Sequence, residues 1–270
     1  MTHLKRWLTA LIAIPILIYI VGFGPRWLFQ LLLFFASCIC LHEFFSLTSP
    51  KLPRGTRALA FVLCFLFLAV LSKGRTGIVL GLAILCFTVM IALSFYLLSL
   101  PALRKDVIDD TGKLALGFLY IGLPLSLLVL IHQAPRGNEW IFFLLTVIFL
   151  GDTGAFYCGR LLGKHKLYVS VSPGKTWEGG AGGFASSVLG GIFFAQAFDL
   201  HDSVWIIGGL SGALSIAGQF GDLAESMIKR NYGVKDSGKM LPGHGGFLDR
   251  VDSLLFAIPV CYAFIMWSIR

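Results

Sequence analysis

Residues 204–228 read VWIIGGLSGALSIAGQFGDLAESMI, an apolar stretch that turns acidic near its end. A helix needs about 20 predominantly apolar residues to cross a bilayer, so this stretch is long enough for a membrane span. Asp222, Glu225, Ser226 and Lys229 follow one another at i, i+3, i+4 and i+7 and share one helix face. Because charged groups are costly inside a bilayer, this face predicts a functional site at the end of a membrane helix.

The composition extends this interpretation to the whole chain. Of 270 residues, 57% are hydrophobic and 13% are charged, and the mean hydropathy is +0.83. Soluble domains contain about 25% charged residues. Apolar stretches lie at 7–24, 27–47, 57–72, 77–100, 114–133, 139–158, 180–198, 204–228 and 251–269. We predict an all-α integral membrane protein with about nine transmembrane helices. The first stretch predicts a retained helix rather than a signal peptide, because it is long and no small-residue cleavage site follows it.

The lysines and arginines predict the orientation of the chain. Most of the 22 fall in one set of alternate loops, which places these loops and the N-terminus in the cytoplasm. Residues 1–110 then form four N-terminal helices. Residues 111–270 form the remaining five, with cytoplasmic loops 159–179 and 229–250 carrying the catalytic site. The expected location is the inner (cytoplasmic) membrane, crossed several times, with the active site facing the cytoplasm.

Charge and cysteine content narrow the function classes. In a membrane protein, a net charge of +8 indicates contact with anionic lipid and an anionic substrate rather than with nucleic acid. The six cysteines form no CxxC pair and lie mostly in apolar stretches, so they predict neither a zinc site nor a disulfide framework.

Two acids on neighbouring helices are the candidate metal ligands. Asp222 lies near the end of the stretch 204–228 and Asp249 lies just before the stretch 251–269, so the connecting turn can bring them together. Paired carboxylates suit Mg²⁺, with water and substrate oxygens as further ligands. The alternative is that the two acids form ion pairs with Lys229 or Arg250. For Glu225 and Asp252, direct ligation and an indirect role are equally open.

The connecting loop contains Pro242-Gly243-His244-Gly245-Gly246 directly before a helix. Glycines at a helix N-terminus can present backbone N–H groups to an anion, although many such loops are simple turns. The nearby cations Lys235, Lys239 and Arg250 favour phosphate binding for the glycines and for His244.

A second polar loop follows Asp152, an acid within an apolar stretch and therefore a functional candidate. Residues 172–176, SPGKT, lack the spacing and the preceding strand of a P-loop, but Lys175 remains a candidate phosphate contact. For Trp177, a place in the aromatic belt is favoured over base stacking. His42-Glu43 predicts either a cap at the membrane interface or a lipid headgroup contact, and the cap is favoured.

The window from Ser226 to Asp252 resembles the signature of the phosphatidate cytidylyltransferase (CDP-diacylglycerol synthase) family in full: Ser-x2-Lys-Arg-x4-Lys-Asp-x5-Pro-x-His-Gly-Gly-x2-Asp-Arg-x-Asp. Residues 151–155, GDTGA, and 172–179, SPGKTWEG, resemble bacterial members of that family. The resemblance implies the reaction of CTP with phosphatidic acid to give CDP-diacylglycerol and pyrophosphate, in the membrane and with Mg²⁺. It further implies a homodimer and a second, monovalent cation such as K⁺.

The resemblance also implies roles for individual residues. Asp222 and Asp249 correspond to the metal ligands. The residues expected at the reacting phosphates are Asp222, Lys229, Arg230, His244, Asp249 and Arg250. Those expected around the nucleotide and its metal are Asp152, Ser172, Lys175, Thr176, Glu178, Lys235, Asp236, Lys239, Gly245 and Gly246.

The chemistry agrees with a site rich in cations. The nucleophile is a lipid phosphate whose second pKa is about 6, so it is largely charged at neutral pH and needs no strong base. One alternative is a CTP-dependent polyprenol or phytol kinase, which needs a base for an alcohol. Another is a cation-coupled transporter, for which the sequence lacks paired broken helices and internal symmetry. The motif of CDP-alcohol transferases is absent, which excludes that class.

Overall fold

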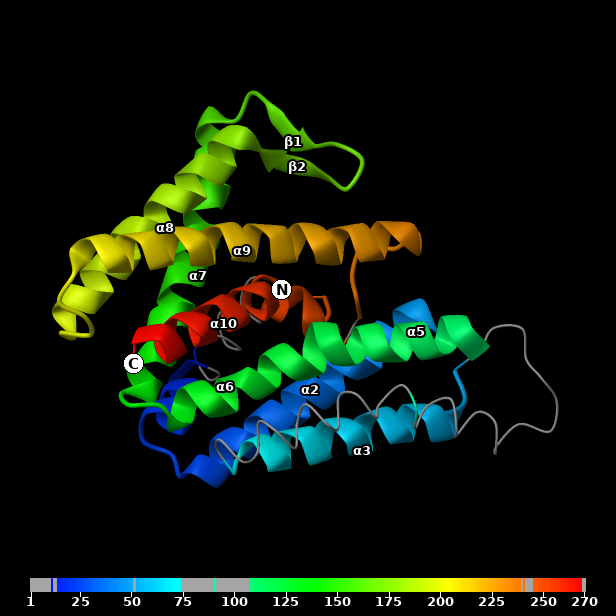
Figure 1. Cartoon of the computed structure of the whole chain (residues 1–270). Helices are drawn as coiled ribbons and strands as arrows, with labels where there is room; N and C mark the ends of the chain where they lie inside the picture. Colours follow the sequence, from blue (N-terminus) through cyan, green and yellow to red (C-terminus); the bar gives the residue numbers. More distant parts are fainter. Residues whose placement is uncertain are drawn as a thin grey trace. The chain divides into compact units, whose positions relative to one another are not determined.

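The computed structural model describes residues 11, 14–50, 52–73, 90, 107–238, 240 and 245–268 (Figure 1). The chain forms two compact units, residues 1–130 with 236–248 and residues 131–235 with 249–270. The expected division at residue 110 into four and five helices stays a prediction.

Within the described residues, six helices are long and apolar enough to cross a membrane. They are α2 (Arg26–Thr48), α3 (Arg54–Leu71), the continuous helix of α5 (Val107–Gly117), η1 (Phe118–Gly122) and α6 (Leu123–Gln133), α7 (Gly137–Leu162), α9 (Val204–Asn231) and α10 (Leu248–Ser268). The stretch at 77–100 lies outside the described residues except for residue 90, and the stretch at 7–24 does so in part. The predicted stretch at 180–198 corresponds to α8 (Trp177–Ala197), whose glycines and serines lower its hydropathy and keep it out of these six.

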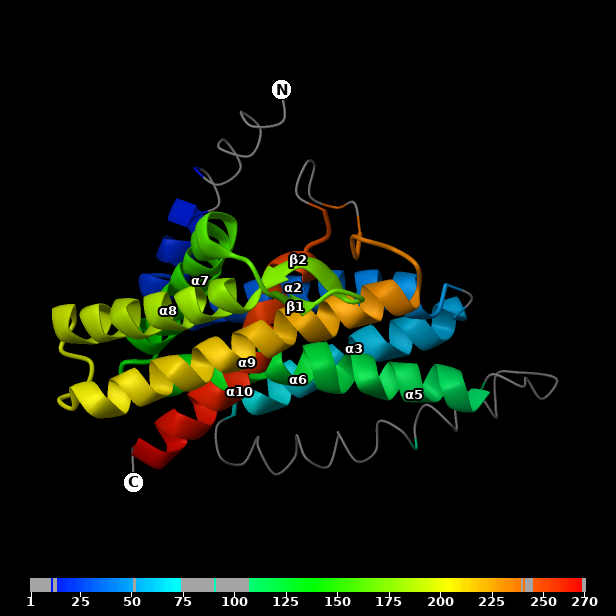
Figure 2. The ribbon, with the colours of Figure 1, turned by 90° about the horizontal axis from the view of Figure 1, so that it is seen from above.

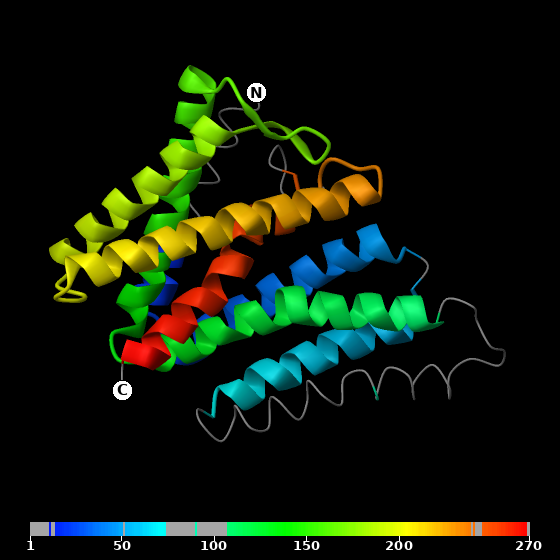
Figure 3. The ribbon, with the colours of Figure 1, turned by 45° about the horizontal axis from the view of Figure 1, so that its top comes forward.

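The first unit is built from α2, α3, α5 and η1, which lie side by side in Figures 1 and 3. Their core is aromatic: Phe44 and Phe45 of α2 are fully buried, and Phe67 meets Phe118 edge to face with ring centroids 5.1 Å apart. Gly117 permits this packing, since a Cβ there would lie 3.0 Å from the Phe44 ring. The core therefore holds α2 firmly, and α2 carries Glu43.

The second unit contains α7, α8, α9 and most of α10. Small residues let α7 and α8 approach closely: a Cβ on Gly183 would lie 2.8 Å from the carbonyl oxygen of Gly151. Ser187 donates a hydrogen bond to the Val147 carbonyl oxygen at 2.8 Å across the same contact. Figure 2 shows α8 beside α9. Close packing of these helices brings their polar ends together.

The two predicted loops differ from expectation in extent. Helix α7 continues to Leu162, and β1 (Lys166–Tyr168) pairs antiparallel with β2 (Ser172–Thr176), a hairpin that the all-α prediction did not include. Helix α8 then begins at Trp177, where the Thr176 hydroxyl accepts a hydrogen bond from the Gly179 N–H at 3.1 Å. In the other loop, the helices extend to Asn231 and from Leu248, so the connection is shorter than 229–250.

Candidate functional site

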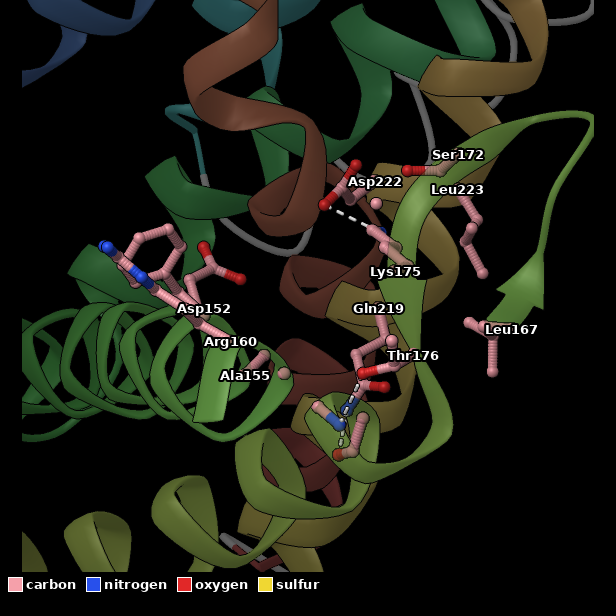
Figure 4. Close-up of a pocket in the computed structure, with 15 residues that line it drawn as sticks. Asp152, Ala155, Arg160, Leu167, Ser172, Lys175, Thr176, Gln219, Asp222 and Leu223 are labelled. Atoms are coloured by element: carbon pink, nitrogen blue, oxygen red, sulfur yellow. Dashed lines mark hydrogen bonds and ion pairs between the residues drawn. The ribbon is translucent and has the colours of Figure 1, made fainter. Parts of the chain in front are cut away.

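A cavity of about 660 Å³ opens in the second unit (Figure 4). It is lined from α7 by Asp152, from the hairpin by Ser172, Lys175 and Thr176, and from α9 by Asp222. All five were candidates from the sequence. The structure therefore brings together Asp152, the SPGKT segment and Asp222.

Lys175 and Asp222 form an ion pair among the residues that line the cavity. The Lys175 Nζ lies 2.7 Å from Asp222 Oδ2, and both side chains are only about one third exposed or less (Figure 4). Asp152 and Asp252 each interact repulsively with Asp222. Three carboxylates from α7, α9 and α10 thus gather with one lysine, an excess of negative charge that a cation would offset.

Lys229 forms a second polar centre on α9. Its Nζ lies 2.6 Å from Oε2 of Glu225 and 2.5 Å from Oδ1 of Asp249, and the Glu225 carboxylate is buried. Asp249 therefore forms an ion pair with Lys229, which is the alternative to metal binding that the sequence left open. Gly221 allows this close approach of α9 and α10, because a Cβ there would lie 2.5 Å from the Asp252 carbonyl oxygen.

Arg230 connects the end of α9 with the hairpin. Its Nε donates to the Val171 carbonyl oxygen at 3.3 Å, and its Nη1 donates to the Val234 carbonyl oxygen at 3.2 Å. Arg230 thus fixes the position of β2, on which Lys175 lies. The expected phosphate contact of Arg230 stays a prediction.

Glu178 and Thr176 stabilise the first turn of α8. Glu178 accepts hydrogen bonds from the His165 backbone N–H at 3.2 Å, and its Oε1 lies 2.6 Å from the His165 Nδ1. The Glu178 backbone N–H at the helix start, the His165 side chain and the backbone N–H groups of His165 and Lys164 lower the pKa of Glu178 to about 2. The Glu178 side chain is therefore ionised at neutral pH and directed to His165, and it is not among the residues that line the cavity.

The remaining candidates lie elsewhere. Lys235, Asp236 and Arg250 are exposed and do not line the cavity. Gly245 adopts a left-handed backbone conformation with φ of 84°, and Gly246 is buried. Lys239 and His244 lie outside the described residues.

The donor atoms suit a hard divalent cation. Asp152, Asp222 and Asp252 offer carboxylate oxygens, the ligands that Mg²⁺ prefers. Among the described residues, no group of three His, Cys, Asp or Glu side chains is already arranged around one point. Because Asp222 and Asp249 are held by lysines, a metal at either acid would take the place of an ion pair.

Two polar side chains of the cavity lining, Gln219 and Arg160, were not among the candidates. Gln219 lies one turn before Asp222 on the same face of α9, and its Nε2 donates to the Gly180 carbonyl oxygen at 3.2 Å. Arg160 lies near the end of α7. Gln219 could be predicted from the sequence, because residues at i and i+3 share one helix face and Gln219 lies three residues before Asp222.

Comparisons with known proteins agree with this chemistry. The model of the cytidylyltransferase family matches residues 4–268. A phosphatidate cytidylyltransferase of Staphylococcus epidermidis is 36% identical over 260 residues, which cover 94% of this chain and 96% of the relative. The enzyme of the same name from Staphylococcus saprophyticus is 41% identical over 63% of this chain and 66% of its own length. That from Staphylococcus aureus is 38% identical over 66% of this chain and 69% of its own length.

Proposed function

The chain belongs to the cytidylyltransferase family, and we propose on this basis that it transfers the cytidylyl group of CTP to phosphatidic acid. The products are CDP-diacylglycerol, a precursor in phospholipid biosynthesis, and pyrophosphate. The observation that supports a location for the active site is the cavity, which Asp152, the SPGKT segment and Asp222 line together. The matched family offers no support for the lipid kinase or the transporter.

The reaction joins two anions, and the residues of the second unit lower their repulsion. An oxygen of the lipid phosphate attacks the α-phosphorus of CTP, the bond from that phosphorus to the bridging oxygen breaks, and pyrophosphate leaves. We assign the attraction of phosphate oxygens to Lys175, which lines the cavity, and to Lys229, which pairs with Glu225 and Asp249. No side chain has to remove a proton, because the lipid phosphate is already charged.

A divalent cation, Mg²⁺, is part of the proposal. We assign Asp222 and Asp249 as its ligands, as the family signature implies, with Asp152 and Asp252 as the neighbouring carboxylates. When bound, Mg²⁺ supplies Lewis-acid stabilisation of phosphate charge. A second, monovalent cation such as K⁺ beside it and the phosphate contacts of Arg230, Lys235, Lys239, His244 and Arg250 belong to the same proposal.

The topology and assembly are also proposed. About nine spans, a cytoplasmic N-terminus and a site that faces the cytoplasm follow from the distribution of Lys and Arg. The chain then resides in the inner membrane as a homodimer, and CTP enters from the cytoplasm.

A single assay distinguishes the cytidylyltransferase from the kinase. Purified protein in detergent receives CTP labelled in the cytidine ring, phosphatidic acid and Mg²⁺. We expect labelled CDP-diacylglycerol and an equal amount of pyrophosphate, and no turnover of the lipid alcohol without its phosphate. Release of CDP with transfer of the γ-phosphate to lipid would reject the proposal.

A further inference from the structure

A buried carboxylate of α2 contacts the loop of the signature. Glu43, which is 4% exposed, accepts hydrogen bonds from the backbone N–H of Phe247 at 3.0 Å and of Leu248 at 2.8 Å. The Ser237 hydroxyl lies 3.2 Å from its Oε2. All of these atoms belong to the first unit. One side chain therefore connects both ends of the loop 236–248.

These contacts place negative charge at the start of α10. Phe247 and Leu248 stand where the helix begins, and the first N–H groups of a helix have no acceptor within the helix itself. A carboxylate at such N–H groups forms charge-assisted hydrogen bonds and interacts favourably with the helix dipole. Glu43 thus serves as an N-terminal cap for α10, although it lies on another helix and far away in sequence.

The glycines of the loop are shaped around this carboxylate. A Cβ on Gly246 would lie 2.7 Å from Glu43 Oε2, and a Cβ on Gly238 would collide with Oε1. Only glycine leaves room for Glu43 at both positions. Gly238 and Gly246 therefore accommodate a side chain of the protein, in addition to any contact with substrate.

From this geometry we infer that Glu43 is a positioning residue for cytidylyl transfer. Its carboxylate holds the Ser237 hydroxyl and the backbone N–H groups of Phe247 and Leu248. Glu43 thereby fixes the residues that directly precede Asp249 and Arg250 in the chain. The inference rests on the proposed function. It also means that the Phe247 and Leu248 N–H groups bind Glu43, so a substrate phosphate binds at other donors.

The test combines turnover with hydrogen exchange. Glu43→Gln preserves the shape of the side chain but removes its charge and one of its two acceptor oxygens. We expect turnover per folded molecule to fall at least about tenfold, because small displacements of reacting groups are costly. Amide hydrogen exchange of residues 245–250 should be faster, while that of α7 is unchanged. Ser237→Ala, which removes only the hydroxyl contact, should give a smaller effect in the same direction.

The control is Glu139→Gln, the same exchange on a glutamate that pairs with Arg136 at the start of α7. This variant should show the turnover of the wild type and the same rate of amide hydrogen exchange at residues 245–250. Turnover is measured on monodisperse protein below its unfolding temperature, so a merely structural role would lower the melting temperature and leave turnover unchanged. Wild-type turnover in Glu43→Gln, or unchanged exchange at residues 245–250, would overturn the inference. Absence of CDP-diacylglycerol with the wild-type protein would instead reject the proposed function.

Discussion

Lys229 shows how one side chain organises several others. Its ammonium group lies between Glu225 and Asp249, on successive helices, and this position offsets the repulsion between the two acids. The Lys175–Asp222 pair has the same form at the cavity wall. Each pair presents a cation and a carboxylate side by side, the two kinds of group that phosphate and Mg²⁺ require.

At this scale, the role of Asp222 is open to a direct measurement. If Asp222 is the proposed metal ligand, Asp222→Asn should lower turnover by at least about a hundredfold, because the metal loses a carboxylate that holds it. Its ion pair is partly exposed and is worth about 1 kcal/mol or less, so the protein should remain folded. The control is Asp109→Asn, which breaks the exposed pair with Lys113 and should leave turnover unchanged. Near wild-type turnover at saturating Mg²⁺ would remove Asp222 from the ligands.

Asp249 requires a different readout, because it is paired with Lys229 in the structure. If Asp249 is a metal ligand, Asp249→Asn should raise the Mg²⁺ concentration for half-maximal turnover at least about tenfold. If it only pairs with Lys229, maximal turnover should fall without a change in the Mg²⁺ dependence. A magnesium titration of the variant beside the wild type separates the two roles.

At the scale of elements, the site depends on how closely α7 and α8 pack. Asp152 lies on α7, and β2 leads directly into α8, so the distance between the helices sets the width of the cavity. Gly183→Ala places a methyl group 2.8 Å from the Gly151 carbonyl oxygen and 3.0 Å from the Ala155 Cβ. We expect it to destabilise the protein by about 1–3 kcal/mol, as overpacking does, and to lower the melting temperature.

The matched control is Gly209→Ala, also in a helix, where nothing lies within 4 Å of the new Cβ. Alanine favours a helix over glycine by about 1 kcal/mol, so this variant should melt at the same temperature or slightly higher. Equal melting temperatures for the two variants would show that α7 and α8 are not in close contact.

At the scale of the whole molecule, the two ends of α8 test the topology. With the site facing the cytoplasm, the hairpin residue Lys166 lies on the cytoplasmic side and Asp202, in the turn after α8, on the opposite side. In a background without the six native cysteines, Lys166→Cys should react with a membrane-impermeant thiol reagent only in inside-out vesicles. Asp202→Cys should react only in right-side-out vesicles. Reaction of both cysteines from the same side would show that α8 does not span the membrane. The proposed number of spans would then be wrong.

The fold class and many of the candidate site residues of this protein can be predicted from its sequence. The apolar stretches predicted a membrane protein of helices, because hydropathy over about 20 residues is a local property. The charged signature identified the chemistry, since carboxylates, cations and glycines within a short window serve phosphate and metal together. The sequence predicts Asp152, Ser172, Lys175, Thr176 and Asp222 as site residues, and all five line one cavity. The hairpin was missed, because its two short strands carry no alternating pattern of apolar residues.

The partners of these residues depended on contacts between distant parts of the chain. Lys175 meets Asp222, Lys229 meets Asp249, and Glu43 caps a helix that begins at Leu248. The sequence favours a cap at the membrane interface for His42-Glu43, whereas Glu43 accepts hydrogen bonds at the start of a helix near the opposite end of the chain. A buried carboxylate needs hydrogen-bond donors, and in a folded chain these come from whichever backbone packing brings near. Local sequence specifies the kind of group at each position, whereas packing selects the group that it meets.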